Sequence, residues 1–312
     1  MLIRRRRGWE IPEREATPER LVLNRRHFLG ALAGASALAA CSRAIDAREL
    51  EEKLGSLPAP LAAERNPAFT LAGPVTERAP TLLYNNFYEF SESKDVWRHV
   101  EPYQPEPWTV EVTGLVQKPR TWDIDAIREL PLEERLYRHR CVEAWYMDVP
   151  WTGIPLRSLL APSEPLAKAT HVRFTSLLRP EEMPGQKKRW YTWPYYEGLT
   201  LGEAMNELTL ATVGMYGAQL AKQSGAPFRV VVPWKYGYKG PKAVVKIELV
   251  ERQPKTFWND EQPSEYGFES NVNPKRPHPR WSQASERSID GAKSRQTLLY
   301  NGYGEWVADL YA

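Results

Sequence analysis

Hydrophobic and polar positions alternate in several short stretches of the chain, and a period of two is typical of β-strands with one buried face. The alternation predicts strands over residues 108–114 and 171–176. β-Branched residues predict two more strands over residues 228–232 and 243–250. A further strand near residues 135–137 would deliver the residues that follow it to a loop.

Capping residues predict short helices between these strands. Asp123 has the position of an N-cap after a strand end, and Thr200 and Glu203 have the spacing of a capping box. Residues 155–160 suit a short helix with proline in its first turn, and residues 47–54 suit another. Strands outnumber helices and do not alternate with them regularly, so the expected fold class is α+β rather than doubly wound.

The first 44 residues have the pattern of an export signal. Arg25 and Arg26 precede a weakly apolar run that is too short to span a bilayer. Paired arginines before such a run resemble a twin-arginine signal, which predicts delivery to the periplasm by the twin-arginine export machinery. Residues 45–79 are then expected to form an N-terminal arm ahead of one domain over residues 80–312.

The end of this signal is ambiguous. Residues 38–41 read Leu-Ala-Ala-Cys and resemble a lipobox, whose cysteine would become the lipidated first residue. A signal-peptidase cut between residues 42 and 47 is equally compatible with the small side chains there. Either outcome leaves Cys141 without a disulfide partner in its own chain, which points to reactivity or ligation. A buried cysteine that only packs is the alternative.

The positive net charge of the chain comes from the predicted export signal. The 312 residues carry a net charge of +3, but residues 1–41 alone hold eight arginines and four glutamates. The remaining residues number 34 basic against 35 acidic, so the charge gives no argument for a nucleic-acid partner. The sequence also lacks a Rossmann or Walker glycine loop, a histidine pair at zinc-ligand spacing and a Gly-x-Ser-x-Gly elbow.

Residues 138–145 read Arg-His-Arg-Cys-Val-Glu-Ala-Trp and surround Cys141 with charged side chains. Nearby positive charge lowers the pKa of a thiol and favours the thiolate, the form that attacks electrophiles or binds metals. We therefore expect the cationic side chains before Cys141 to favour its ionised form.

A basic, glycine-rich turn over residues 233–242 separates two of the predicted strands and follows Arg229. Arginine clamps phosphate through two hydrogen bonds, lysine acts as a point charge, and glycine lets backbone N–H groups approach an anion. Interleaved tryptophan and tyrosine indicate a walled pocket, and a solvated basic hairpin is the alternative. Residues 84–90 are dense in amides and aromatics, which suits either a ligand-binding loop or a turn packed by aromatic rings.

Four separated motifs occur in the order expected of a known family. They are residues 84–90, 138–145, 179–186 and 225–237. Together they resemble the catalytic subunits of bacterial periplasmic protein-methionine-sulfoxide reductases, a family of sulfite-oxidase-like molybdopterin enzymes. The resemblance implies a sulfite-oxidase-like molybdopterin-binding fold, with mixed β-sheets and short helices, for residues 80–312. It also implies one molybdenum-molybdopterin cofactor per chain.

The resemblance assigns roles to individual residues. Cys141 would be the protein ligand of molybdenum, a metal suited to a soft thiolate, with Asn86 and Glu143 facing the open side of the metal. The residues that would hold the pterin are Asn85, Tyr88, Glu89, Ser176, Ser224, Arg229, Gly240, Pro241 and Lys242. Arg229 and Lys242 are expected on the cofactor phosphate. Ser176 and Ser224 depart from the family pattern, which has threonine and an amide at these positions.

The implied activity is the reduction of methionine sulfoxide in oxidised periplasmic proteins. No Cys-x-x-Cys-His haem motif occurs, so electrons must come from a partner. The resemblance implies a haem-binding membrane subunit fed from the quinone pool. Aromatic residues over 190–196 are expected at the mouth of the site. The alternatives are a related enzyme acting on sulfite or small S- or N-oxides, and a cofactor-free exported lipoprotein that binds ligands.

Overall fold

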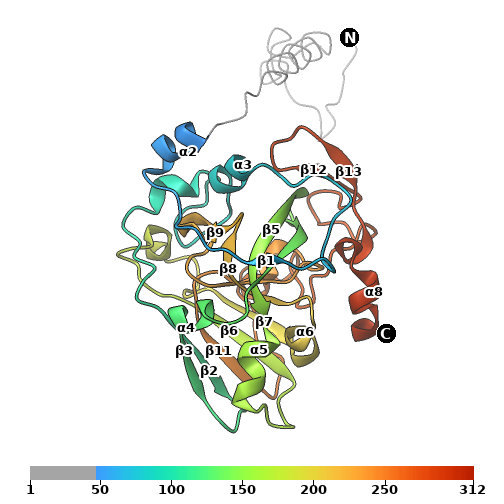
Figure 1. Cartoon of the computed structure of the whole chain (residues 1–312). Coiled ribbons are helices and arrows are strands. Elements are labelled where there is room, and N and C mark those ends of the chain that lie inside the picture. Colours follow the sequence, from blue (N-terminus) through green and yellow to red (C-terminus); the bar gives the residue numbers. More distant parts are fainter. Residues whose placement is uncertain (1–46) are drawn as a thin grey trace, which may run out of the picture. The chain divides into compact units, whose positions relative to one another are not determined.

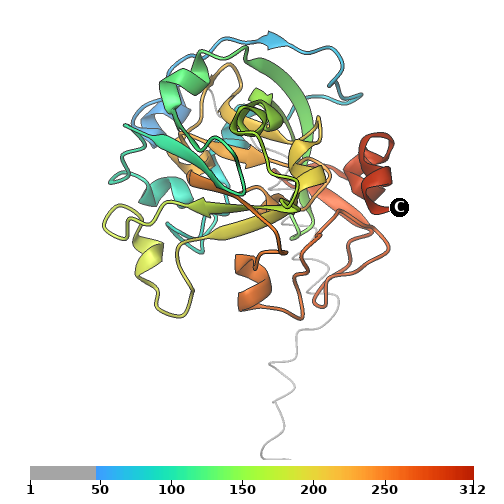
Figure 2. The same ribbon diagram turned by 90° about the horizontal axis from the view of Figure 1, so that it is seen from below.

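The computed structural model describes residues 47–312, so the predicted twin-arginine signal and the lipobox at Cys41 lie outside the described residues. Residues 47–312 cluster as one unit. The arm over residues 45–79 is part of it from residue 47 onward, because its strand β1 (Glu64–Arg65) pairs in parallel with Glu133 and Glu134. Two β-sheets with short helices around them make up this unit (Figures 1 and 2).

The larger sheet has eight strands and is built around β5. Its strands are β1, β4 (Glu133–Arg140), β5 (Trp145–Pro155), β8 (Leu210–Met215), β9 (Ala218–Gln219), β10 (Arg229–Val231), β12 (Ser285–Ser288) and β13 (Ser294–Gln296). On one side, β5 pairs antiparallel with β4, and the two strands form a hairpin. On the other edge, β12 pairs in parallel with the start of β5 and β8 pairs antiparallel with its end.

The second sheet has five strands in the order β3-β2-β11-β6-β7. Their bounds are β2 (Thr109–Gly114), β3 (Arg120–Asp123), β6 (His171–Ser176), β7 (Tyr196–Thr200) and β11 (Val244–Val250). Buried and more exposed positions alternate along β2 and β6, as the sequence pattern requires. The predicted strands over 108–114, 171–176 and 243–250 are therefore confirmed, as are those near 135–137 and over 228–232.

The helices are short. They are α2 (Ala47–Leu54), α3 (Arg78–Leu83), α4 (Ile124–Arg128), α5 (Arg157–Leu160), α6 (Leu201–Met205), α7 (Phe257–Glu261) and α8 (Gly304–Val307). The 3-10 turns are η3 (Val96–His99), η4 (Ala161–Ser163), η5 (Pro184–Lys187), η6 (Lys222–Ser224), η7 (Gly237–Lys239), η8 (Leu299–Gly302) and η9 (Ala308–Tyr311). Both predicted caps are present: Asp123 accepts from the Asp125 N–H, and Thr200 and Glu203 form a capping box. The short helix predicted over 155–160 is present, but it begins at Arg157, so the predicted proline in its first turn is wrong: Pro155 is the last residue of β5.

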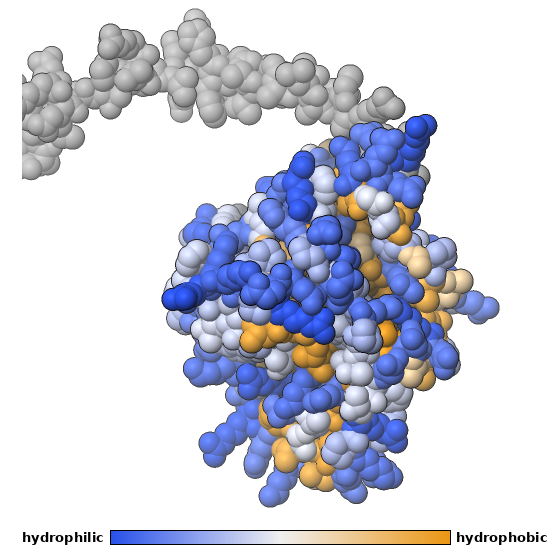
Figure 3. Space-filling view, turned by 90° about the vertical axis from the view of Figure 1, so that its left-hand side faces the viewer, coloured by the Kyte–Doolittle hydropathy of each residue, from blue (hydrophilic) through white to orange (hydrophobic). Residues whose placement is uncertain are grey.

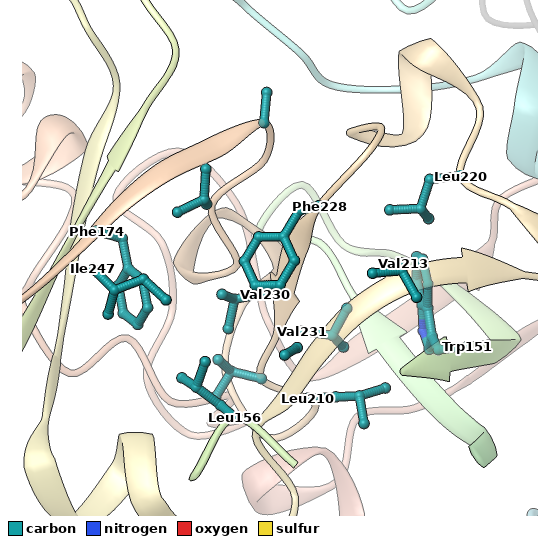
Figure 4. Close-up of a cluster of buried hydrophobic side chains, with 14 of the residues drawn as sticks. Trp151, Leu156, Phe174, Leu210, Val213, Leu220, Phe228, Val230, Val231 and Ile247 are labelled. Carbon is teal, nitrogen blue, oxygen red and sulfur yellow. The ribbon is translucent and has the colours of Figure 1, made fainter. Parts of the chain in front are cut away.

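The main core lies between the two sheets. Phe174 and Ile247 from the smaller sheet and Leu210, Val230 and Val231 from the larger one are buried in one cluster (Figure 4). Such burial of apolar surface is the main stabilising contribution to a fold of this size. On the face shown in Figure 3, hydrophilic residues cover most of the surface, and hydrophobic residues emerge in small groups between them. Within residues 47–312, no helix is long and apolar enough to cross a membrane.

Candidate active site

A cavity of about 820 Å³ opens where the loop before η3, the turn after β4, the turn before β11 and the segment after α7 meet. Its volume lies within the range of roughly 300–1,000 Å³ that is usual for ligand and cofactor sites. Of the predicted site residues, all but Ser176 line it. The Ser176 hydroxyl instead donates to the Lys242 carbonyl from behind the turn, at 2.7 Å.

Cys141 is the first residue of the tight turn that joins β4 to β5. Its N–H donates to the Trp145 carbonyl at 2.9 Å, and its carbonyl accepts from the Ala144 N–H at 3.1 Å. Ala144 has a φ of +64°, a left-handed conformation that closes the turn. The Cys141 sulfur is thereby presented to the cavity, where it accepts from Asn86 Nδ2 at 3.5 Å and from the Glu143 N–H at 3.4 Å.

Glu143 is held by groups on three sides. Lys94 Nζ lies 2.7 and 2.8 Å from its two carboxylate oxygens, Trp145 Nε1 donates at 3.1 Å and Asn86 Nδ2 at 3.3 Å. Lys94 Nζ also donates to Asn86 Oδ1. Burial opposes ionisation of Glu143, but the hydrogen bond and charge of Lys94 outweigh it and lower the Glu143 pKa. Sequence reasoning missed Lys94, which lies in an exposed polar stretch that gives no signal of its own.

The expectation that neighbouring cations keep Cys141 in its ionised form is wrong, although Arg140 and Lys94 do act in that direction. Burial, together with the Glu143 charge, raises the pKa of the thiol to about 12. The Arg138 and Arg140 guanidinium groups both pair with Glu286 rather than with the sulfur, at 3.1 and 2.7 Å. Burial and neighbouring cations lower the pKa of His139 far below its ordinary value, so this ring is neutral. A bound metal ion would supply the missing positive charge, because a coordinating thiol is deprotonated outright.

Another part of the cavity lining is polar and buried. Arg229 Nη1 donates to the Ser224 carbonyl at 2.9 Å, and its guanidinium carbon lies 4.9 Å from the centre of the Trp151 ring. Among the described residues, Arg229 Nε, Ser224 Oγ and Asn85 Oδ1 find no hydrogen-bond partner. Burial lowers the pKa of Arg229 to about 10. These unpaired atoms line the same cavity and are free to bind a polar ligand.

The basic turn contributes one lysine to the cavity. Lys242 Nζ donates to the Asn86 carbonyl at 2.6 Å. Burial and the Arg229 charge lower its pKa, and burial raises the pKa of nearby Glu89 against the Lys242 charge. Lys235 and Lys239 do not line the cavity. They form fully buried ion pairs, 2.5 Å to Glu203 and 2.6 Å to Glu197.

Comparison with known proteins identifies the group to which this site belongs. Residues 98–258 match the family model of the oxidoreductase molybdopterin binding domain. Three relatives carry the name protein-methionine-sulfoxide reductase catalytic subunit MsrP. The one from Burkholderia mallei is 48% identical over 97% of this chain and 94% of its own length. The one from Gluconobacter oxydans is 48% identical over 95% and 93%, and the one from Ralstonia nicotianae is 45% identical over 98% and 95%.

The chain belongs to the MsrP family.

A solved structure shows the same fold at greater distance. The sulfane dehydrogenase SoxCD from Paracoccus pantotrophus matches 70% of this chain and 54% of its own chain, with a TM-score of 0.50 and 13% identity. The α+β, sulfite-oxidase-like fold expected from the sequence is thus confirmed. The catalytic subunits of the MsrP family are oxidoreductases with a molybdopterin-binding domain, and this chain is one of them.

The cavity of this MsrP family member fits a molybdenum-molybdopterin cofactor. The cavity is lined by a thiol and by a buried guanidinium with an unpaired donor, as a group with a metal and a phosphate requires. Gly240 must be glycine, because an added Cβ would lie 2.5 Å from the Val230 carbonyl oxygen. Within residues 47–312, no group of three or more His, Cys, Asp or Glu side chains is arranged to hold a metal ion.

The mouth of the cavity is aromatic. Of the predicted rim over residues 190–196, Tyr191 and Tyr195 line the cavity, while Trp190 is 66% exposed. Trp258 and Trp281 come from the segment after β11, and neither was among the residues predicted for the site. Aromatic rings with polar edges suit a binding site that is apolar at its walls and wet at its opening.

Proposed function

We propose that this chain reduces methionine sulfoxide in exported proteins with a molybdenum-molybdopterin cofactor. The observation that carries the proposal is that the Cys141 sulfur, hydrogen-bonded by Asn86, lines the same cavity as Arg229, which is buried, and Lys242. The names of the relatives support this choice of substrate, because all three are called protein-methionine-sulfoxide reductases.

When bound, the cofactor supplies the two-electron chemistry by which a sulfoxide, two protons and two electrons become a thioether and water. The residues of the chain hold the cofactor and orient the substrate. Cys141 would hold the metal through its thiolate, and Arg229 and Lys242 would hold the phosphate. Asn86 Nδ2 and Lys94 Nζ are the donors beside the sulfur, and they would orient the S–O dipole of the substrate by hydrogen bonds to its oxygen.

The charges beside the Cys141 sulfur favour a neutral substrate. Lys94 lies within 2.8 Å of both Glu143 oxygens, so the two charges largely cancel and Asn86 adds none. A sulfoxide is neutral and dipolar, whereas sulfite is an anion that the Glu143 carboxylate would repel, and the Lys94 charge beside the sulfur is already paired with Glu143. The site therefore favours sulfoxide reduction over the alternative of sulfite oxidation.

We further propose that the electrons come from a haem-binding membrane subunit linked to the quinone pool. The relatives are named catalytic subunits, a term that supports the existence of a second subunit. We also propose that the mature chain works in the periplasm after twin-arginine export, with a lipid anchor if Cys41 is its first residue.

The protein purified after native export is expected to contain close to one molybdenum per chain and to reduce methionine sulfoxide with a reduced viologen dye. Metal analysis and the dye assay measure both. Molybdenum-free protein would instead support the cofactor-free binding lipoprotein. Loaded protein that oxidises sulfite and leaves sulfoxides unchanged would support the related enzyme.

Replacing Arg25 and Arg26 by lysine is expected to hold the precursor in the cytoplasm, because twin-arginine export depends on the arginines themselves. Lysine at Arg4 and Arg5, which precede no apolar run, is the matched control and should export normally. Immunoblots of cell fractions measure the outcome, and periplasmic protein from the first variant would reject the signal. The intact mass of the mature chain then decides whether Cys41 carries lipid.

A further inference from the structure

The turn that carries Cys141 is held by a segment far along the chain. The Val142 carbonyl accepts two hydrogen bonds, from Trp281 Nε1 at 2.8 Å and from Gln283 Nε2 at 2.7 Å. The Ala144 carbonyl accepts from the backbone N–H of Arg287 at 3.0 Å. We call Trp281, Gln283 and Arg287 the C-terminal clamp. It lies after residue 258, where the match to the molybdopterin-domain family model ends.

Gln283 connects this clamp to the base of the turn. Its side-chain carbonyl accepts from Arg140 Nη2 at 2.7 Å, while its amide nitrogen donates to Val142. Arg140 Nη1 in turn donates to the Cys141 carbonyl, and its Nε donates to Glu286 at 2.7 Å. Gln283 is 1% exposed and Arg140 is fully buried, so none of these bonds competes with bulk water.

These contacts remove the freedom of the turn backbone. The carbonyls of residues 141, 142 and 144 are all fixed, so the peptide planes on both sides of Val142 cannot rotate without losing buried hydrogen bonds. The direction of the Cys141 Cα–Cβ bond is then set by the clamp. Groups that orient a metal ligand from behind it tune the geometry and electronics of the metal site.

We propose that Gln283 is a positioning residue for the thiolate ligand: by bridging Arg140 and the Val142 carbonyl, it fixes the direction in which Cys141 presents its sulfur to the metal. The inference rests on the proposed role of Cys141 as molybdenum ligand. Gln283 touches neither the cavity nor the substrate site, so its effect passes entirely through the turn.

The test compares Gln283→Met with Thr297→Val in the loaded enzyme. Both residues are buried and both contact Arg140 Nη2, but Thr297, at 3.3 Å, has no hydrogen bond to the turn. Gln283→Met is expected to shift the electron paramagnetic resonance signal of partly reduced molybdenum and to lower kcat roughly tenfold at unchanged KM. Thr297→Val is expected to leave the signal and kcat unchanged. Molybdenum content and the thermal melt are measured alongside.

Trp281→Phe covers the case in which Gln283→Met does not fold. It removes one hydrogen bond to Val142 while keeping the ring stacked on His278, and it should shift the signal in the same sense by a smaller amount. An unchanged signal in folded, loaded Gln283→Met or Trp281→Phe overturns the inference. So does an equal shift in Thr297→Val. Failure of the proposed function would be seen in the unaltered protein itself, which would then contain no molybdenum or would not reduce sulfoxide.

Discussion

Cys141→Ser is expected to abolish methionine sulfoxide reduction while the protein keeps its fold. A serine hydroxyl is a harder and far less acidic ligand than a thiol, so it donates poorly to molybdenum. Removal of an outer partner of a metal ligand costs roughly 10- to 100-fold in activity, and removal of the ligand itself should exceed that. The measurement is the viologen-linked assay on the purified variant, with a molybdenum count and a thermal melt.

The fold should survive because the new hydroxyl has partners in place. The Glu143 N–H and Asn86 Nδ2 already donate to the sulfur, and both can donate to an oxygen at this position. Arg229 and Lys242 are unaltered, so part of the cofactor should be retained. A cysteine that merely packs predicts the opposite result, with activity kept and stability reduced. Cys141→Ser protein that reduces sulfoxide at the unaltered rate would remove Cys141 from the site.

Arg229→Met is expected to have the second largest effect, a loss of bound cofactor. Among the ion pairs of the described residues, none includes Arg229, although its side chain is buried. A phosphate would supply the missing counter-charge, and losing one partner of such a buried pair costs about 2–5 kcal/mol of binding free energy. Pterin and molybdenum content per purified chain measure the loss.

The same substitution should raise the melting temperature of cofactor-free protein, because methionine removes an uncompensated buried charge. Arg173→Met is the matched control. Its guanidinium lies 5.4 Å from the Tyr196 ring with an unpaired Nε, but outside the cavity, and this variant should load fully. Lys235→Ala is no control, because it would leave the buried Glu203 carboxylate unpaired and cost about 3–5 kcal/mol of stability. Equal pterin content in Arg229→Met and unaltered protein would place the phosphate elsewhere.

The sequence predicted strands that have one exposed and one buried face, and helices that begin at a capping residue. The strands β2 and β6 alternate, and the caps at Asp123 and Thr200 act through residues two or three positions away. The strand β5 was missed because ten of its eleven residues are buried, which leaves no alternation to recognise. The strand β8 is buried along its whole length for the same reason.

The candidate site could be predicted only through resemblance. Asn86 and Glu143 are hydrogen-bonded although they lie 57 positions apart in the sequence, and the local sequence around neither residue indicates this contact. The error over the Cys141 thiol arose mainly from its burial, which the local sequence does not show. Arg138 and Arg140 are close to it in sequence, but side chains alternate along β4 and both arginines point to Glu286. Lys94 and Gln283 were missed because their contacts are also long-range.

The parallel pairing of β12 with β5 imposes an order of events on biosynthesis. The turn at Cys141 is complete only when residues 281–287 have left the ribosome and docked beside it. A nascent chain that has reached β11 already contains every residue proposed to contact the cofactor, up to Lys242, but it lacks the C-terminal clamp that fixes the turn at Cys141. The full set of hydrogen bonds that orients the thiol therefore forms only after residue 287 has been synthesised. In a protein proposed to be exported already folded, a chain truncated before residue 281 would lack the contacts that orient its thiol.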